Sequence, residues 1–364
     1  ADVGSIEFIS ATPSTIGIIG TGAVGGSEDS TILFRVLDRN GNPVKDRDVE
    51  FSLSTSSGGI LIDPLLASTN AEGIVQTVVN SGSVATTVRV NAVVVDSSPV
   101  VSTQSSVLVI STGIPDQDSM SISFSQLNPD AWEKDNVAVD VVVLLADAFN
   151  NPVPDGTAVS FTTEGGSIES SCITAEGGCT VKWRGQFPRP EGQELASNNV
   201  PPRASNIDEQ GFPNFMGQKY GGRVSIIATA IGEESFPDLN GNGRFDVCEV
   251  PAFTGGIGKP CNTDGSFNNN GADITYTGLD ISGRPYDLAE AYADYNEDGF
   301  FNPAEENVNE QAGGELEEYI EFNGDGTFNS QDGLYNGVLC AIPEHAGCSV
   351  TQKSVNVRAQ GTIV

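Results

Sequence analysis

Apolar and polar residues alternate in short segments along much of the chain. Residues 49–53 and 88–92 carry an apolar side chain at every second position, which is the pattern of a β-strand with one buried face. Such segments are rich in β-branched residues and are separated by turns of Gly, Asn, Asp and Pro, without helical periodicity. Short strands at regular spacing predict all-β, antiparallel sandwiches.

The strand pattern occurs twice. A strand ends at Asp38 in the first copy and at Asp147 in the second, and each is followed by an Asn-Pro-Val turn, a Val-x-Phe strand and an Ala-Glu-Gly turn. The corresponding segments are 42–44 and 151–153, 49–51 and 159–161, 71–73 and 175–177, 87–92 and 222–228, and 102–109 and 350–357. The repeat predicts two tandem sandwiches of the immunoglobulin type.

The repeat also predicts the domain boundaries. The first sandwich spans 1–112, a linker follows at 113–118, and the second sandwich spans 119–232 plus 350–364. Two segments interrupt the second sandwich: 184–221, rich in Pro, Asn and Gln, predicts an extended surface loop, and 233–349 is a long insertion. An insertion of this length needs its own stabilisation.

Two segments of the insertion match the twelve-residue calcium loop D-x-[DN]-x-[DN]-G-x5-E. Calcium prefers six to eight oxygen ligands, glycine at position 6 allows the sharp turn, and glutamate at position 12 supplies two oxygens. The predicted ligands, with the backbone carbonyl at position 7, are Asp238, Asn240, Asn242, Arg244, Asp246 and Glu249 in the first loop and Asp294, Asn296, Asp298, Phe300, Asn302 and Glu305 in the second.

A third loop at 321–332 follows the pattern less closely. Its position 12 is an aspartate, which reaches less far than glutamate and predicts a lower affinity. The predicted ligands are Glu321, Asn323, Asp325, Thr327, Asn329 and Asp332. Apolar residues before the second and third loops have helix-compatible spacing and predict two short helices; they are Tyr286, Leu288, Ala291 and Tyr292, and Leu316, Tyr319 and Ile320.

The formal net charge of −32 makes nucleic acid an improbable partner, because phosphates would be repelled. Between Glu233 and Cys348 there are 23 acidic and three basic residues, a density at which carboxylates repel each other unless cations neutralise them. Calcium is therefore the predicted cofactor, with two sites expected and a third possible.

Six cysteines fall in three close pairs, Cys172/Cys179, Cys248/Cys261 and Cys340/Cys348. Six cysteines allow fifteen connectivities, and the short separations favour three local disulfides. Disulfides and weak calcium sites both indicate an oxidising, extracytoplasmic compartment. The sequence shows no signal peptide and no apolar run long enough to span a bilayer, so we expect a mature or excised portion of an exported protein.

The turn and strand motifs around Asp38 and Asp147 resemble the bacterial immunoglobulin-like repeats of the invasin and intimin type. The resemblance covers 1–112 and, discontinuously, 119–232 plus 350–364. It implies sandwiches of seven or more strands in secreted or outer-membrane-associated proteins, often strung as adhesin stalks. The insertion departs from the compact repeat, and its loops resemble those of dockerins and thrombospondin type 3 repeats.

Two features are poor evidence for catalysis. Residues 18–25 match the dinucleotide fingerprint, but a strand at 31–36 follows where the fingerprint requires a helix. His345 is the only histidine and is expected at the surface, which leaves little material for Ser/His or Cys/His nucleophiles. Paired carboxylates for glycoside hydrolysis stay open, since spacing alone identifies no catalytic pair.

We therefore predict a non-enzymatic, secreted or bacterial cell-surface protein of adhesin type, whose calcium-ordered insertion presents a surface for recognition or assembly. Its partner would be an unknown protein or glycan at the cell surface, and further repeats of the same parent chain are possible. One alternative is a calcium-dependent carbohydrate-binding module, with Tyr276 or Tyr335 stacking on sugar. Trp132 and Trp183 are further sugar-binding candidates, although burial in a sandwich core is the commoner role. A second alternative is an accessory portion of a larger extracellular hydrolase.

Overall fold

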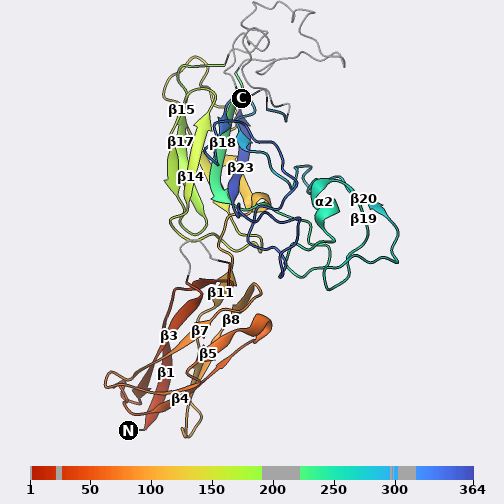
Figure 1. Cartoon of the computed structure of the whole chain (residues 1–364). Helices are drawn as coiled ribbons and strands as arrows, with labels where there is room; N and C mark the ends of the chain where they lie inside the picture. The colour runs from red at the N-terminus through yellow and green to blue at the C-terminus, as the bar shows by residue number, and fades with distance from the viewer. Residues whose placement is uncertain (1, 22–26, 191–221, 296, 298, 302–316) are drawn as a thin grey trace, which may run out of the picture. The chain divides into compact units, whose positions relative to one another are not determined.

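The computed structural model describes residues 2–364 except 22–26, 191–221, 296, 298 and 302–316 (Figure 1). The described chain is nearly all β, in sheets whose strands pair antiparallel, apart from β2 with β11. This confirms the predicted fold class. Contacts divide the chain into two units, Ala1–Ile114 with Phe149–Asn151, and Pro115–Ala148 with Pro152–Val364.

The first unit contains three sheets, in the strand orders β1-β3-β7-β5, β10-β9-β4-β6 and β2-β11-β8. Its strands are β1 (Val3–Thr12), β2 (Thr15–Gly17), β3 (Asp29–Asp38), β4 (Asp48–Leu53), β5 (Leu61–Asp63), β6 (Leu66–Ser68), β7 (Ile74–Asn80), β8 (Thr86–Val88), β9 (Val90–Val94), β10 (Ser102–Gln104) and β11 (Leu108–Ser111), with a 3-10 turn at Ser57–Gly59. Strand β3, not a helix, follows the glycines at 18–25, so the fingerprint lacks the element that would receive a dinucleotide.

The second unit repeats the strand order of the first, with β12-β13-β17-β15 in one sheet and β16-β14-β18-β23 in the other. Its sandwich strands are β12 (Met120–Phe124), β13 (Ala138–Leu145), β14 (Ala158–Thr163), β15 (Ser167–Ile168), β16 (Ser171–Ile173), β17 (Gly178–Arg184), β18 (Val224–Gly232) and β23 (Val355–Ile363), with a 3-10 turn at Gln117–Ser119. The matching order shows that both sandwiches are built on one plan.

The last strands of the two units correspond in a different register from the one that the sequence repeat predicts. Ser102 pairs with Val93 on β9, and Arg358 pairs with Thr229 on β18. Because β9 and β18 occupy the same place beside β4 and β14, Ser102 matches Arg358 rather than Val350. The alignment of 102–109 with 350–357 was wrong, because short β-branched segments look alike in several registers.

Each unit has its own core. In the first, β3, β4, β7 and β9 bury alternate side chains such as Phe34 and Phe51, whose rings stack at 5.8 Å. In the second, β13, β14, β17, β18 and β23 bury a cluster that includes Phe161, Trp183 and Leu288. Leu288 belongs to the insertion, so the insertion contributes to the sandwich core.

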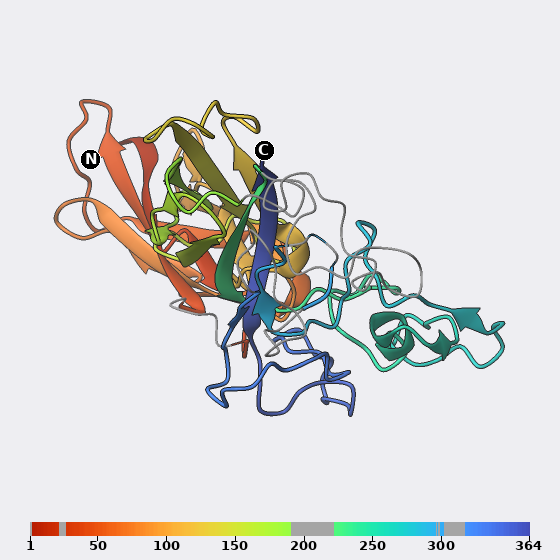
Figure 2. The same ribbon diagram turned by 90° about the horizontal axis from the view of Figure 1, so that it is seen from above.

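The insertion holds little regular structure: α2 (Val250–Thr254), β19 (Ile257–Gly258), β20 (Ile274–Thr275), β21 (Ala291–Tyr292) and β22 (Tyr319–Ile320). The segment that carries α2, β19 and β20 stands to the side of β18 and β23 (Figure 1, Figure 2). Another part covers β18, where Ile227 packs with Ala293 and Tyr295. Strand β18 is consequently buried on both faces, apart from Ile231.

The predicted helices before the second and third loops were wrong. Residues 291–292 and 319–320 are strands β21 and β22, which pair antiparallel, while Leu316 lies outside the described residues. Apolar side chains at i, i+3 and i+4 also fit a short strand flanked by turns when the run is only a few residues long. Here the pairing of the two segments with each other makes both of them strands.

The three disulfides join Cys172 with Cys179, Cys248 with Cys261, and Cys340 with Cys348. These are the predicted pairs. No helix in the described part of the chain is long and apolar enough to cross a membrane.

Candidate metal centres

The first loop is wound around the carboxylate of Asp238. Its Oδ1 accepts hydrogen bonds from the amides of Gly241 (2.7 Å) and Asn242 (3.1 Å), and its Oδ2 accepts one from Gly243 (2.9 Å). Gly243 has φ 72°, a conformation that glycine adopts without strain. The position-1 carboxylate therefore faces the inside of the turn, as calcium ligation requires.

Glu249 closes the same loop from position 12. Its Oε1 accepts the amide of Leu239 at position 2 (2.6 Å), and its Oε2 accepts the amide of Asp246 at position 9 (2.9 Å). The residue is fully buried, and this burial raises the pKa of its carboxyl to about 7. A carboxylate held like this needs a proton or a cation at neutral pH.

The remaining side-chain ligands of the first loop gather at the same place. The side-chain amides of Asn240 and Asn242 donate to Asp246 Oδ2, at 2.8 and 2.7 Å. Arg244 is at position 7, where only its backbone carbonyl is a predicted ligand, and its amide donates to Asn242 Oδ1 (2.8 Å). The structure thus brings the predicted residues of the first loop together.

The second loop is described only in part. Asp294 Oδ2 accepts the amide of Gly299 (2.9 Å), the contact that Asp238 makes with Gly243. The side chain of Phe300, at position 7, is exposed. Asn296, Asp298, Asn302 and Glu305 lie outside the described residues.

The third loop is wound around Glu321. Its two carboxylate oxygens accept the amides of Gly324 (2.7 Å) and Gly326 (2.8 Å). Asp325 Oδ1 accepts the amide of Thr327 (2.7 Å), and Asn329 Nδ2 donates to Asp325 Oδ2 (3.0 Å). These contacts join the same six positions, 1, 4, 5, 6, 7 and 9, as in the first loop, with donor and acceptor exchanged between positions 5 and 9.

Asp332 does not take the position-12 contacts of the third loop; Glu290 does. Glu290 Oε1 accepts the amide of Phe322 at position 2 (3.0 Å), and Oε2 accepts the amide of Asn329 at position 9 (3.0 Å). These are the amide positions that Glu249 binds in the first loop. Asp332 Oδ1 instead accepts the amide of Leu334 (2.8 Å).

Glu317 makes the position-2 contact of the second loop. Its Oε1 accepts the amide of Tyr295 at position 2 (3.2 Å), and the residue is 3 % exposed. Sequence reasoning missed both glutamates because it looked only within each twelve-residue loop. The available signal was a glutamate four residues before each loop, Glu290 before Asp294 and Glu317 before Glu321.

Strands β21 and β22 explain this exchange. Ala291 pairs with Ile320, and Tyr292 pairs with Tyr319. Glu290, directly before β21, therefore lies beside the third loop, and Glu317, two residues before β22, lies beside the second. The position-8 rings also meet, with the centroids of Phe301 and Phe328 4.4 Å apart. The second and third loops therefore form a pair that shares strands, rings and glutamates.

The second loop is attached to the sandwich. Glu297 accepts two hydrogen bonds from the Arg223 guanidinium, at 2.9 and 2.7 Å. Gln360 on β23 donates to the backbone oxygen of Asp294 (2.6 Å) and accepts from its amide (3.3 Å). The second loop is thereby bonded to the edge strand of the sheet.

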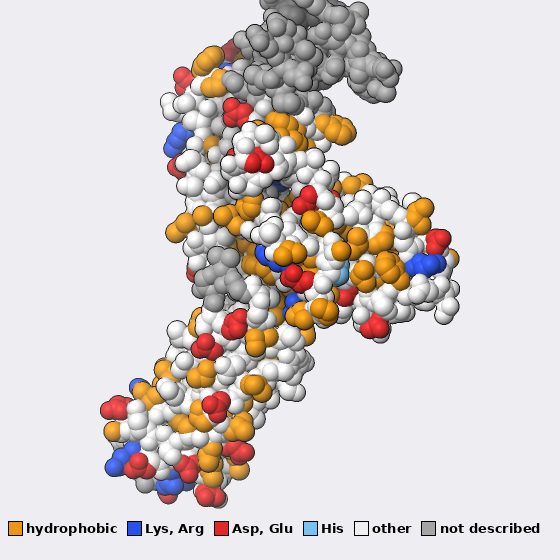
Figure 3. Space-filling view, viewed as in Figure 1, with side chains coloured by type: hydrophobic (Ala, Val, Ile, Leu, Met, Phe, Trp, Pro, Cys, Tyr) orange, Lys and Arg blue, Asp and Glu red, His pale blue; other side chains and the backbone are white. Residues whose placement is uncertain are grey.

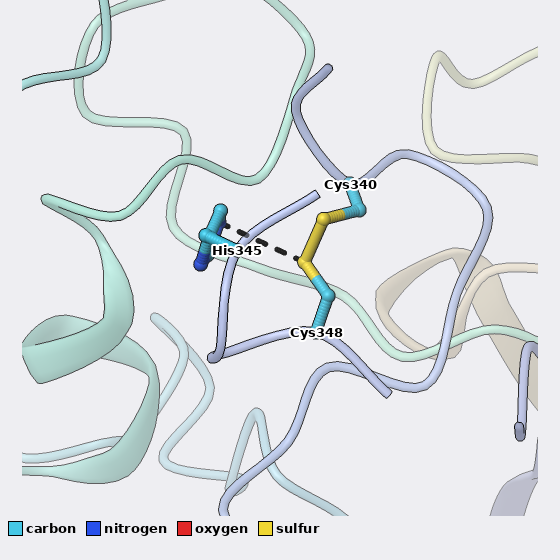
Figure 4. A group of neighbouring side chains, drawn as sticks. All are labelled: Cys340, His345 and Cys348. Carbon is cyan, nitrogen blue, oxygen red and sulfur yellow. Dashed lines mark hydrogen bonds between the residues drawn. A yellow bond between two sulfur atoms is a disulfide. The ribbon is translucent and has the colours of Figure 1, made fainter. Parts of the chain in front are cut away.

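Among the described residues, two groups of cysteine with histidine or glutamate are close enough to suggest a metal site, but both contain disulfides. Cys348 Sγ lies 3.7 Å from His345 Nε2, and Figure 4 shows its disulfide bond to Cys340. Thiolate is the ligand form of cysteine, so a disulfide offers no zinc ligand. The same holds for Cys248 and Cys261 beside Glu249.

His345 is half-buried rather than a free surface residue. Its ring packs 5.4 Å from that of Phe245, and its Nε2 lies 3.0 Å from the Phe245 backbone oxygen. The structure also changes which of the predicted aromatic side chains are accessible for stacking on a sugar. Tyr335 is fully buried, and Trp183 is a core residue whose Nε1 donates to Gly165 O (2.8 Å), whereas Trp132 is 43 % exposed.

Comparison with protein-family profiles finds no matching family, and comparison with curated proteins finds no match. Among solved structures, the D0-D1 domain of intimin is similar over 62 % of this chain and 90 % of its own, with 14 % identity and a TM-score of 0.26. InvD of Yersinia pseudotuberculosis is similar over 62 % of this chain and 52 % of its own (14 % identity, TM-score 0.31). Invasin, described as a bacterial integrin-binding protein, is similar over 76 % of this chain and 49 % of its own (11 % identity, TM-score 0.24).

This chain thus spans about half the length of the InvD and invasin structures. At identities and TM-scores this low, the similarities assign no family to it.

Proposed function

We propose that the chain is a non-enzymatic, extracytoplasmic protein of adhesin type whose insertion binds calcium and presents a recognition or assembly surface. The observation that carries the calcium proposal is the first loop. Five backbone amides hold the carboxylates of Asp238 at position 1 and Glu249 at position 12, and Glu249 is buried.

The donor set favours calcium over softer metals. The side chains gathered in the first loop supply carboxylate and amide oxygens, which are ligands for hard cations. The cysteines nearest to them are oxidised to disulfides, so they do not select zinc. When bound, the ion would neutralise carboxylates that otherwise repel each other.

Calcium binding would order the insertion and fix it against the sandwich. In the second loop, Asp294 is a predicted ligand and is also bonded to Gln360 on β23. Its neighbour Glu297 pairs with Arg223. A loop closed around an ion would hold these contacts in place.

The proposed recognition surface is the outer face of the insertion. Figure 3 shows hydrophobic side chains gathered on this part of the molecule. The apolar residues of the insertion with the largest exposed fractions are Ile257, Ile281, Phe300 and Ile342. Exposed apolar side chains near charged ones are typical of binding surfaces for proteins and glycans.

The extracytoplasmic assignment is supported by the three disulfides, which persist in oxidising compartments. The adhesin assignment is supported by the resemblance of the strand and turn motifs to invasin- and intimin-type repeats. Binding to cell-surface protein extracts and to a glycan array, each with calcium and with chelator, would distinguish a protein partner from a glycan partner.

The calcium proposal is tested by thermal unfolding and limited proteolysis in millimolar calcium and in excess chelator. If each site binds only the folded state, calcium at a hundred times Kd adds about 2.7 kcal/mol per site. Chelation should expose 233–349 to cleavage and lower the transition of the second unit alone.

Glu249→Gln should bind one calcium ion fewer than wild type. Glu318→Gln, at an exposed residue of the same insertion, should bind the wild-type number. The calcium proposal is wrong if neither cleavage nor unfolding responds to chelation and calorimetry detects no binding.

A further inference from the structure

Three side-chain oxygens of the insertion are buried without a hydrogen-bond partner among the described residues: Glu233 Oε1, Asp287 Oδ1 and Asn336 Oδ1. The last two belong to residues that are 8 % and 3 % exposed. A buried polar atom without a partner is costly. The last two atoms are of the kind that binds calcium, which directs attention to the segments around 287 and 332–336.

The first contact between these segments repeats the winding of a calcium loop. Asp287 Oδ2 accepts the amide of Gly333 at 2.8 Å. In the first and second loops, the position-1 aspartate accepts the amide of the position-6 glycine at 2.9 Å. Asp287 thus corresponds to position 1, and Gly333 corresponds to position 6, although 46 residues separate them.

The next positions follow in order. Asp332 Oδ1 accepts the amide of Leu334 (2.8 Å), as position 5 accepts position 7 in the third loop (2.7 Å). Asn336 Nδ2 donates to Leu334 O (3.2 Å), as position 9 donates to position 7 there (2.8 Å). Asp332 is consequently position 5 of this arrangement rather than position 12 of the third loop.

The position-12 contacts come from Glu234. Its Oε1 accepts the amide of Leu288 (2.7 Å), and its Oε2 accepts the amide of Asn336 (2.6 Å). Leu288 and Asn336 are positions 2 and 9, which Glu249 binds in the first loop and Glu290 binds in the third. The same two amide positions are therefore held by a glutamate in three places.

Sequence and packing support the correspondence independently. Residues 332–336 read Asp-Gly-Leu-Tyr-Asn, and 325–329 read Asp-Gly-Thr-Phe-Asn. The ring of Tyr335 at position 8 lies 5.0 Å from that of Phe245, the position-8 residue of the first loop. The second and third loops meet through position-8 rings in the same way.

We propose that Asp287, Asp332, Asn336 and Glu234 form a further calcium site, built from a loop that is split between positions 2 and 5. The second and third loops are inserted at the split. No lysine or arginine in the described part of the chain forms an ion pair with these carboxylates, so a divalent cation would supply the missing charge and accept the two unpartnered oxygens.

This site would anchor the base of the insertion. Glu234 follows β18 by two residues, and Leu288 packs in the sandwich core. An ion here would tie the start of the insertion to both ends of the paired loops. The proposal rests on the proposed function, because its contacts are recognised by likeness to loops proposed to bind calcium.

The test is the number of calcium ions bound by the full chain, measured by native mass spectrometry and by titration of calcium chloride into chelator-treated protein. Asp287→Asn and Glu234→Gln should each bind one ion fewer than wild type. Glu249→Gln, which removes the first site, should also lose one ion, and the double variant Asp287→Asn/Glu249→Gln should lose two. Glu318→Gln is the matched control and should keep the wild-type number.

Asn336→Asp tests calcium binding at the split site without removing any of its carboxylates. It adds a carboxylate where the amide oxygen lies and should lower the Kd of one site by about tenfold. If Asp287→Asn and Glu234→Gln bind the wild-type number of calcium ions while Glu249→Gln binds one fewer, the proposal of a split site is wrong. The proposed calcium function then stands. If those two variants fail to fold, an unchanged Kd at every site in Asn336→Asp overturns it. If wild type binds no calcium, the proposed function fails first.

Discussion

At the scale of residues, backbone amides decide which carboxylate belongs to which loop. Glu249, Glu290 and Glu234 each accept the amides of positions 2 and 9 of a loop, but only Glu249 comes from the loop it closes. A glutamate side chain can be supplied from any neighbouring segment, because the requirement is its position in space and not its place in the sequence.

Glu290→Gln should weaken the third site by about 10-fold to 100-fold, the usual range for losing a group that orients a metal site. Asp332→Asn should leave the third site unchanged and weaken the split site instead. Calorimetric titration of each variant in a Glu249→Gln background would resolve the individual sites. Loss of the third site in Asp332→Asn, with none in Glu290→Gln, would restore the position-12 role of Asp332.

Asp116 provides a pH test that is separate from the calcium loops. Burial raises the pKa of its carboxyl from 3.8 to about 7, against the hydrogen bond from Ser235. Between about pH 4 and 7 the folded state keeps a proton that the unfolded state releases. The free energy of unfolding should therefore fall as pH rises through this window, by about 1.4 kcal/mol per pH unit.

Asp116→Asn carries no titrating group at this position, so its free energy of unfolding should fall less steeply with pH. The slope should be smaller by the contribution of about one proton, and the stability near pH 4 should be unchanged. Urea unfolding in chelator at several pH values between 4 and 8 measures it. A variant with the full wild-type slope would show that Asp116 does not titrate in this window.

At the scale of elements, a two-residue strand pair organises two loops. Strands β21 and β22 place Glu290 beside the third loop and Glu317 beside the second. Four rings then fill the space between the loops, those of Tyr292, Phe301, Tyr319 and Phe328. Because each loop depends on the other for a glutamate and for packing, binding at the two sites should be coupled.

Phe301→Ala should weaken calcium binding at both the second and the third loop, although it lies in only one of them. Each lost ring contact is worth about 1 kcal/mol, which corresponds to about a fivefold increase in Kd. Binding at the first loop, where Phe245 holds the equivalent place, should not change. An effect confined to the second loop would contradict the coupling.

In the whole molecule, the two units have separate cores, and a residue of the insertion belongs to the core of the second unit. The first unit buries Phe34 of β3 against Phe8 of β1 and Phe51 of β4, whereas the core of the second unit includes Leu288 of the insertion. The stability of the second unit should thus depend on calcium, and that of the first should not.

Phe34→Ala should destabilise the first unit by about 3–5 kcal/mol, the usual result of removing a buried ring. The transition of the second unit and its response to calcium should be unchanged. Differential scanning calorimetry with calcium and with chelator separates the two transitions. A shift of both transitions by the same amount would show that the units unfold together.

Local sequence pattern was enough to predict the sandwiches and the first loop. Alternation at 49–53 and the repeated turns after Asp38 and Asp147 predicted the sandwiches, and the spacing of Asp238, Gly243 and Glu249 predicted a loop that the structure closes. Local patterns succeed here because a strand or a twelve-residue loop is specified by neighbours along the chain.

The distant residues that complete the loops become visible only in the folded chain. Glu290, Glu317 and Glu234 act on loops other than their own, and Asp287 meets Gly333 across two inserted loops. The same applies to β21 and β22, whose spacing fitted a helix until each found its pairing partner. A carboxylate is selected by distance to an amide, and that distance exists only after the chain has folded.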